Sequence, residues 1–137
     1  MIHRQMKQAL RFSLSIQVSP EDLDELQHVN NTVYLRYIQE AAIAHWYQAA
    51  PAEIVEAYRW VVRKHEITYF KPAFAHENLQ ITTWIDAFQG VTSVRHYTIH
   101  RNDDLLVEAT TTWISLDATS LRPKRILTDL SPFFFLG

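Results

Sequence analysis

The sequence predicts an α+β fold in which one curved antiparallel sheet of about five to six strands wraps around a single long helix. Two patterns in the chain support this prediction. A strand pattern at 11–18 leads into the longest helical pattern in the sequence, and from residue 59 onward strand patterns alternate with short turns. Helix and strands are therefore segregated along the chain, as in α+β domains.

One domain, residues 1–137, is expected because the length lies in the usual range of a single domain. The apolar fraction of 47% and the charged fraction of 20% are those of an ordinary globular protein. No internal repeat, linker or low-complexity segment interrupts the chain. The many aromatic residues leave material for an apolar face that contacts a second subunit.

The bulk properties exclude several classes of partner and site. A formal charge of −2 without a long basic run gives no general attraction to nucleic acid or to anionic membranes. The absence of cysteine excludes disulfides and thiolate catalysis and fits a reducing compartment. Residues 1–10 are too polar for a signal peptide, and no run of 18 apolar residues occurs. We therefore expect an uncleaved cytoplasmic protein that does not insert into membranes.

The first strand and the helix are read from their periodicities. Apolar and polar residues alternate over 11–18, and Pro20 ends the strand because proline cannot donate to the ladder. After a loop, the helical pattern begins near Val33, with Asn30 or Asn31 as its cap, and runs to about Ala49. Pro51 ends it and can occupy the first position of a short second helix over 51–58.

Five strands and an apolar tail are predicted in the rest of the chain. Short turns separate strands predicted at 59–70, 79–88, 92–100, 105–117 and 124–127, so these are antiparallel neighbours. The charges at 63, 64 and 66 favour a bulge or a sheet edge. One helix covers only one face of such a sheet, so the other face needs polar residues or a second subunit, and Trp60, Trp84, Tyr97 and Trp113 favour the subunit. The apolar tail at 131–137 is expected to pack on its own domain or on a neighbour.

Several kinds of site are excluded by simple counts. The only glycines are Gly90 and Gly137, so there is no phosphate-binding glycine loop, and no serine lies in a G-x-S-x-G elbow. No histidine pair has helical metal-ligand spacing; His96 and His100 fall on a predicted strand. His45 on the helix is interpreted as a hydrogen-bonded core histidine. We expect no metal site.

The remaining candidate is Asp24 in the loop before the helix. Such an aspartate is ordinarily a solvated turn residue. The first amides of a helix, however, are free to bind negative charge that develops on a carbonyl oxygen. A carboxylate beside such amides is sufficient for transfer of an acyl group to water.

The segment Asp24-x-x-x-His28-Val29-Asn30-Asn31-x-x-Tyr34 resembles the motif D-x-x-x-H-V-N-N-x-x-Y of hotdog-fold acyl-CoA thioesterases, the 4-hydroxybenzoyl-CoA thioesterase-like family. The segments at 67–72 and 117–125 resemble the strand that enters a proline and the late D-x-x-T-x-R-P turn of that family. The similarity thus spans nearly the whole chain. It implies a hotdog fold and hydrolysis of an acyl-CoA to a free acid and CoA.

The resemblance also implies roles for individual residues. Asp24 matches the catalytic carboxylate, as general base or as nucleophile, and the backbone amide of Asn31 matches the group that polarises the thioester carbonyl. His28, Asn30 and Tyr34 match substrate-binding positions, although Asn30 and Asn31 can equally serve as helix caps. No cofactor is implied, since coenzyme A is part of the substrate. Homo-oligomers are expected, either a dimer whose sheets join edge to edge with sites at the interface, or a tetramer.

Some positions depart from the family pattern, and some alternatives stay open. Gln27 stands where many relatives have glycine, and residues 75–77 stand where many have Gly-Asp, so loop shape and substrate can differ. Glu40 is a second candidate carboxylate because another branch of the fold uses one on the helix. The CoA phosphates can be held by any of the basic residues at 63, 64, 71, 95, 122, 124 and 125.

Three other functions remain as alternatives. The substrate can be a thioester of acyl carrier protein instead of CoA. A hotdog dehydratase or hydratase needs a histidine paired with an acid, and His45 is the only histidine in a helical context. A hotdog protein that binds acyl thioesters without catalysis needs no further feature, because the same pocket serves both purposes.

Overall fold

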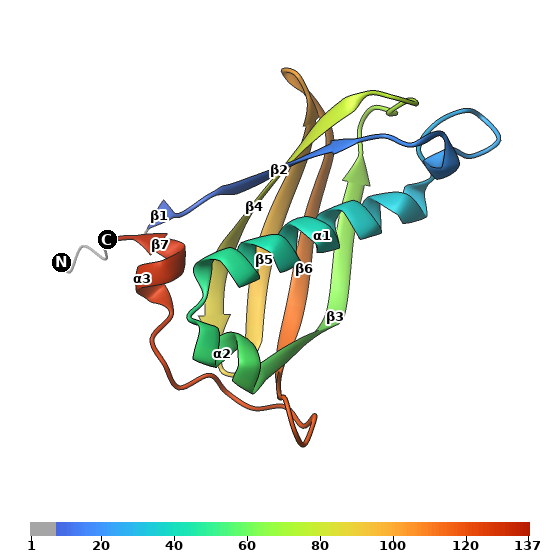
Figure 1. Ribbon diagram of the computed structural model, residues 1–137. Helices are drawn as coiled ribbons and strands as arrows, with labels where there is room; N and C mark the ends of the chain where they lie inside the picture. Colours follow the sequence, from blue (N-terminus) through green and yellow to red (C-terminus); the bar gives the residue numbers. More distant parts are fainter. Residues whose placement is uncertain (1–7) are drawn as a thin grey trace.

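The computed structural model describes residues 8–137, in which one long helix crosses one face of a five-stranded antiparallel sheet (Figure 1). The strand order is β2-β4-β5-β6-β3, and a separate pair of short strands joins the two ends of the chain. The main sheet consists of β2 (Phe12–Gln17), β3 (Tyr58–Tyr69), β4 (Asn78–Gln89), β5 (Thr92–Arg101) and β6 (Asp104–Asp117). The predicted α+β class and the helix-in-sheet arrangement are confirmed.

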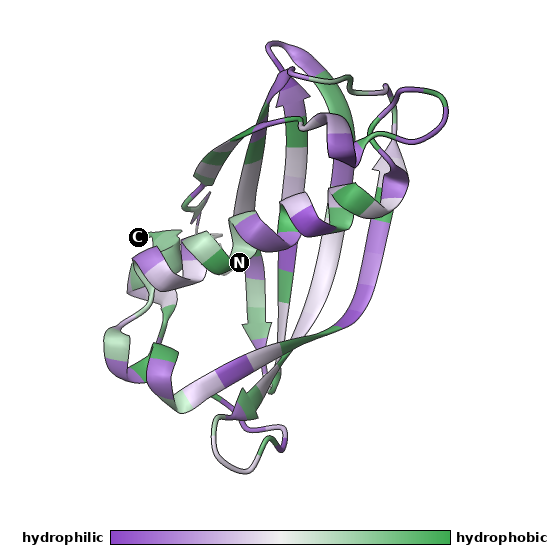
Figure 2. Cartoon of the chain, turned by 45° about the vertical axis from the view of Figure 1, so that its right-hand side comes forward, coloured by the Kyte–Doolittle hydropathy of each residue, from purple (hydrophilic) through white to green (hydrophobic). Residues whose placement is uncertain are grey.

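Helix α1 (Asn31–Ala49) begins and ends where its sequence signals predict. Asn30 caps its first turn, and α2 (Ala52–Ala57) follows Pro51, which is the cap of that short helix rather than its first residue. Hydrophobic and hydrophilic residues occur in bands along α1 (Figure 2), and its inner side is buried. The small Ala41 and Ala42 belong to this buried side, so the helix approaches the sheet closely.

The core lies between α1 and the inner face of the sheet. Alternate residues of the strands point toward the helix, as the period of two predicts. In β5 the buried positions are Ser93, Arg95, Tyr97 and Ile99, so a charged residue occupies a core position among apolar neighbours. The largest fully buried side chains on the strands are Leu79, Ile81, Ile85, Tyr97, Ile99 and Leu106.

The outer face of the sheet is largely polar. Of the two expectations for this face, polar residues or a second subunit, the polar residues are therefore the one observed. Tyr97 is buried on the helix side, and Trp60 contacts Trp46 of α1 with ring centroids 5.3 Å apart. Trp84 is shielded locally: the Arg11 guanidinium lies 3.8 Å from the centre of one of its rings, and the His96 ring stacks at 5.6 Å. Trp113 packs against the core on the helix side, where its Nε1 donates to Tyr97 Oη at 3.2 Å. The expectation that these aromatic residues call for a subunit on the outer face is therefore wrong for Trp60, Tyr97 and Trp113.

Strand β3 forms one edge of the sheet and pairs only with β6 among the described strands. Its register with β6 shifts between Val62 and Lys64, so the bulge predicted from the charged residues is present. Val61, in the first half of this edge strand, is 43% exposed. An open edge of this length is a natural site for pairing with another chain.

The predicted strand at 124–127 is wrong. No strand ladder continues from the isolated bridge between Leu116 and Pro123: past it, Lys124 N donates to Ser115 O, and Lys124 O accepts from the side chain Ser115 Oγ instead of from a strand amide. Pro123 has no amide to extend the ladder, and the side chain of Leu127 is 82% exposed, so no buried face holds a strand there.

The apolar tail packs on its own domain, as one of the two expectations states. Helix α3 (Ser131–Phe134) places Phe134 in a fully buried position against Trp46 and Phe88, and β7 (Phe135–Leu136) pairs with β1 (Gln8–Ala9). The expectation about a signal peptide concerns residues 1–10, most of which lie outside the described residues. No helix in the described part of the chain is long and apolar enough to cross a membrane.

Candidate functional site

The loop that carries Asp24 is closed at its base and tied to the start of α1. Leu23 and Val29 form an isolated antiparallel bridge, and Asp24 N donates to His28 O at 2.7 Å. Just outside this bridge, Asn30 N donates to Asp22 O at 2.9 Å, next to the short 3₁₀ helix η1 (Pro20–Asp22). The loop therefore holds Asp24 close to the N-terminus of the helix.

The carboxylate of Asp24 is half-buried and is oriented through one of its two oxygens. Oδ1 accepts hydrogen bonds from Leu26 N at 2.9 Å and from His28 N at 3.3 Å. Oδ2 has no hydrogen-bond partner among residues 8–137. The loop amides thus position the carboxylate and leave one oxygen available for a substrate or a water molecule.

Asn30 and Asn31 have different roles at the helix start. Asn30 Oδ1 accepts from Thr32 N at 3.0 Å and from Thr32 Oγ1 at 2.9 Å, so Asn30 is the cap that the sequence left open between two residues. Asn31 occupies the first helical position, where an amide has no acceptor in the preceding turn. Its amide is therefore a free donor at the positive end of the helix dipole.

His28 and Tyr34, the other two predicted site residues, pack against aromatic rings. His28 is half-buried with its ring edge-on to Phe74 at 5.2 Å. Tyr34 is buried, 2% exposed, and touches Tyr37 and Tyr69. Burial raises the pKa of Tyr34, and the nearby Ala73 backbone opposes part of this rise. The Tyr34 hydroxyl has no hydrogen-bond partner among residues 8–137. Tyr34 thus belongs to the core directly beneath the first turn of α1.

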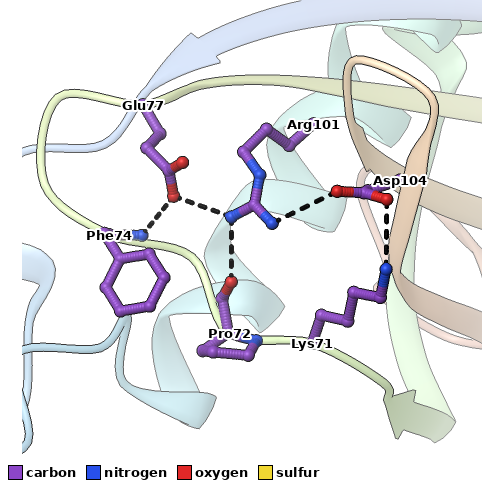
Figure 3. Close-up of polar contacts among 6 residues, drawn as sticks. All are labelled: Lys71, Pro72, Phe74, Glu77, Arg101 and Asp104. Atoms are coloured by element: carbon purple, nitrogen blue, oxygen red, sulfur yellow. Dashed lines mark hydrogen bonds and ion pairs between the residues drawn. The ribbon is translucent and has the colours of Figure 1, made fainter.

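A second loop, 70–77, contacts the Asp24 loop and is itself held by Arg101 and Glu77 (Figure 3). Val29 N donates to Ala73 O at 2.9 Å. Arg101 Nη1 donates to Pro72 O at 3.1 Å and to Glu77 Oε1 at 2.9 Å, and the same carboxylate oxygen accepts from Phe74 N at 2.7 Å. This network fixes the backbone on which Val29 and the His28 ring rest.

The buried acidic residue beside this loop, Asp22, is structural. Asp22 is buried; its Oδ1 accepts from Arg36 Nη2 and its Oδ2 from Tyr37 Oη, both at 2.7 Å. Burial by itself would raise the pKa of Asp22, but the hydrogen bonds from Arg36 and Tyr37 outweigh it and the pKa is lowered. Both oxygens of Asp22 are thus occupied, in contrast to those of Asp24.

Glu40, the second candidate for the catalytic carboxylate, lies on an exposed part of α1. Its side chain is 50% exposed and pairs with Arg36 one turn earlier at 3.7 Å. It is not among the residues that line the cavity described next. Its position gives no support to a catalytic role.

A cavity of about 460 Å³ lies between the second half of α1, α2 and the inner face of β3, β5 and β6. Aromatic side chains form much of its wall, and none of the five predicted site residues lines it. Its lining includes Trp46, Tyr58, Trp60, Trp113, Gln39 and Arg95. Within one chain, the residues of the motif and this cavity are thus at different ends of α1.

Arg95 is the functional candidate that the sequence pattern placed wrongly. The sequence offers it only as one of seven basic residues that can hold the CoA phosphates, yet its side chain is only 4% exposed. The alternation of β5 was a usable signal, since Arg95 shares its face with the core residues Tyr97 and Ile99. Nη1 of Arg95 donates to His45 Nδ1 at 2.8 Å and to Thr83 Oγ1 at 3.1 Å.

The surroundings of His45 argue against the dehydratase alternative. His45 is buried, stacks on Phe12 at 5.1 Å and accepts a hydrogen bond from Arg95. Its neighbour is therefore a cation and not the acid that such an enzyme needs. Within residues 8–137, no group of histidine and acidic side chains is arranged to hold a metal ion.

The family model of the thioesterase-like superfamily matches residues 18–134. The chain belongs to the thioesterase-like superfamily. The match begins just before the Asp24 loop and ends in α3, so it includes every predicted site residue. Comparison with curated proteins gives no significant match.

Solved structures of thioesterases share the fold with this member of the superfamily. The YbaW probable thioesterase from Escherichia coli superposes with a TM-score of 0.77 at 22% identity, covering 88% of this chain and 93% of its own. The 1,4-dihydroxy-2-naphthoyl-CoA thioesterase Slr0204 from Synechocystis gives 0.74 at 19% identity, with coverages of 89% and 93%. The DHNA-CoA thioesterase from Staphylococcus aureus gives 0.76 at 17% identity, with coverages of 84% and 80%. At these identities the likeness shows the fold, and the fold is the hotdog fold implied by the sequence motif.

Proposed function

We propose that this protein hydrolyses an acyl-CoA thioester to the free acid and CoA, with Asp24 as the catalytic carboxylate. The observation that carries the proposal is the carboxylate of Asp24, in which Oδ1 is held by loop amides and Oδ2 has no partner among residues 8–137. It lies next to a helix start at which the Asn31 amide is available as a donor. Membership of the thioesterase-like superfamily supports thioester hydrolysis as the reaction class. The CoA thioesterase activity in the names of two structural neighbours favours CoA over acyl carrier protein.

The chemistry assigns one task to each group. Oδ2 of Asp24 either removes a proton from the attacking water or attacks the thioester carbon itself. The carbonyl oxygen becomes negative as the new C–O bond forms, and the Asn31 amide stabilises that charge. The C–S bond then breaks, and the thiolate of CoA leaves and takes up a proton. If Asp24 attacks, water hydrolyses the resulting anhydride in a second step.

The position of the cavity favours a dimer with shared sites. Gln39, at the near end of the cavity, lies roughly 12 Å along the helix from Asn31, and Trp46 lies roughly 22 Å away. If two β3 edges pair antiparallel about a two-fold axis normal to the sheet, the α1 helices run in opposite directions on the same face. The helix start of one protomer then lies toward the cavity of its partner. We propose that the acyl group occupies this cavity while the thioester lies at the partner's helix start.

Three variants test the assignment by release of free thiol from a panel of acyl-CoAs. Asp24→Asn should reduce kcat on the order of 10²-fold or more. Asn31→Pro removes the amide hydrogen together with the side chain and leaves the backbone undisturbed, because proline is favoured at the first helical position and Asn30, with ψ 136°, already has a backbone suited to precede it. It should reduce kcat roughly 10²- to 10³-fold.

Asn31→Ala is the matched control, since it keeps the amide and should retain activity. Unchanged rates in Asp24→Asn overturn the role of the carboxylate, and equal rates in Asn31→Pro and Asn31→Ala overturn the role of the amide. Hydrolysis of acyl carrier protein thioesters but not of acyl-CoAs would identify the carrier protein as the substrate. Tight binding of acyl-CoA without turnover would indicate a binding protein, and hydration of an enoyl-CoA without cleavage a hydratase.

A further inference from the structure

The cavity beside α1 has an unbalanced charge. Arg95 and Arg59 are among its lining residues, and none of the other lining residues in the described part of the chain is an aspartate or a glutamate. The rest of the wall is apolar or neutral, with several aromatic side chains. A buried cation without a counterion is costly, because the apolar wall replaces the water that would solvate the charge.

Arg95 is only partly satisfied by its protein partners. Its Nη1 donates to two neutral acceptors, His45 Nδ1 and Thr83 Oγ1. Nε and Nη2 have no hydrogen-bond partner among residues 8–137, although the side chain is 4% exposed. His45 and Thr83 hold the guanidinium from one side and leave its remaining donors for a molecule in the cavity.

The second arginine of the cavity is differently employed. Arg59 Nη1 donates to the carbonyl oxygens of Val55, Glu56 and Tyr58, so it caps the C-terminal end of α2. Its side chain belongs to an exposed residue of the edge strand. Arg95 is therefore a buried cation without an acidic partner in the described part of the chain.

From these contacts we propose that the cavity binds an acyl group bearing a carboxylate at the end far from the thioester, paired with Nε and Nη2 of Arg95. This inference rests on the proposed thioesterase function and specifies its substrate class. A carboxylate matches the fork of guanidinium donors and supplies the missing negative charge. A methyl-terminated acyl chain would leave the buried donors of Arg95 unpaired.

The walls of the cavity further define the acyl group. Trp46, Tyr58, Trp60 and Trp113 provide flat apolar surfaces, which suit an aromatic acyl group. Trp60 Nε1, also on this wall, is a buried donor without a partner among residues 8–137. An aromatic acyl group with a distal carboxylate therefore satisfies both the shape and the donors of the site.

The kinetic test uses a matched pair of thioesters, 4-carboxybenzoyl-CoA and 4-methylbenzoyl-CoA. Wild type should prefer the carboxylated thioester in kcat/KM by roughly 10- to 100-fold, the effect of a charge-assisted hydrogen bond in a buried site. Arg95→Met, which keeps most of the side-chain volume, should lose this preference by slowing hydrolysis of the carboxylated thioester only. Arg11→Met, an equal change on the outer face of the sheet, should keep it. If Arg95 only supports α1, both thioesters should be slowed equally by Arg95→Met, and the proposal is overturned.

A binding measurement separates this inference from the thioesterase proposal. Benzoate should bind wild type more tightly than benzyl alcohol in calorimetric titration, and this difference should disappear in Arg95→Met or, should that variant not fold, in Arg95→Gln. Benzoate binding that depends on Arg95, without turnover of any acyl-CoA, would support carboxylate binding in the cavity and refute acyl-CoA hydrolysis. Turnover without a preference for the carboxylated thioester in wild type would support acyl-CoA hydrolysis and refute carboxylate binding by Arg95.

Discussion

Nη1 of Arg95 lies 2.8 Å from Nδ1 of His45, and both side chains are buried. A guanidinium can only donate, so Nδ1 accepts and the proton of the neutral imidazole is on Nε2. Burial and the charge of Arg95 lower the pKa of His45 to about 4. His45 is therefore neutral in the folded protein at physiological pH, and protonating it opposes folding.

This pair predicts a loss of stability in mild acid. Because the pKa of His45 falls from 6.5 in the unfolded chain to about 4 in the folded one, the unfolded state binds more protons between these values. The stabilisation is fully present above about pH 6.5 and decreases as the pH falls toward 4, by about 3 kcal/mol in total. Urea unfolding at a series of pH values measures the slope of the free energy of unfolding against pH.

The control for this experiment is His45→Gln, whose amide oxygen can still accept from Arg95 but does not titrate. The slope between pH 6.5 and 4 should become shallower in this variant. A remainder is expected from His65, whose pKa burial also lowers. The buried Asp22 contributes only at lower pH, because its pKa lies below 3.8. Identical slopes in wild type and His45→Gln would contradict the assignment.

The hydrogen bond from Tyr37 Oη to Asp22 Oδ2 predicts a specific stability defect. Tyr37→Phe removes the donor and leaves one oxygen of a buried carboxylate unpaired, so the free energy of unfolding should decrease by roughly 1–3 kcal/mol. Tyr47→Phe is the matched control, since Tyr47 is 67% exposed on the same helix and should unfold as wild type. Equal effects of the two substitutions in thermal unfolding would show that the bond is not stabilising.

The sequence predicts the elements of this fold well because each is marked by a local signal. The period of two in the strands, the asparagines before α1 and the proline after it fix those elements within a residue or two. The segment at 124–127 misleads for the same reason, since its apolar Ile126 and Leu127 look like a strand although only Ile126 packs partly against the core and Leu127 is exposed.

The candidate site is only partly readable from the sequence, because its contacts are made across the fold. The motif points to Asp24, but no pattern shows that Asp22, two residues earlier, is buried against Tyr37. Arg95 resembles other basic residues until the neighbouring buried strand positions are considered, and its contact with His45 joins residues of β5 and α1. Whether Asp24 and Asn31 act on substrate remains a prediction.

Gln27 offers a test of the departure from the glycine found in many relatives. Its φ of 63° lies in the left-handed region, so the loop keeps the conformation that favours glycine although a side chain is present. Gln27→Gly should relieve this strain and raise the free energy of unfolding by roughly 0.5–1 kcal/mol. This is the cost of a side chain at positive φ minus the additional conformational entropy that glycine loses on folding. Gln17→Gly, in the exposed part of β2, should instead destabilise the protein. A lower melting temperature for Gln27→Gly would contradict the prediction.

The open edge of β3 predicts that assembly and activity are lost together. Light scattering of wild type should give about twice the 16.1 kDa of one chain, or a multiple of that pair. Val61→Lys should shift the protein toward monomers, because Val61 is an exposed apolar residue of this edge and lysine is a residue that blocks edge pairing. If the acyl group lies in the cavity of one protomer and the thioester at the helix start of its partner, acyl-CoA hydrolysis should fall with the dimer fraction. Leu127→Lys, an equal change at an exposed residue outside the sheet, should alter neither mass nor rate. A monomeric wild type with full activity would refute the shared site, since one chain would then supply both the carboxylate and the cavity.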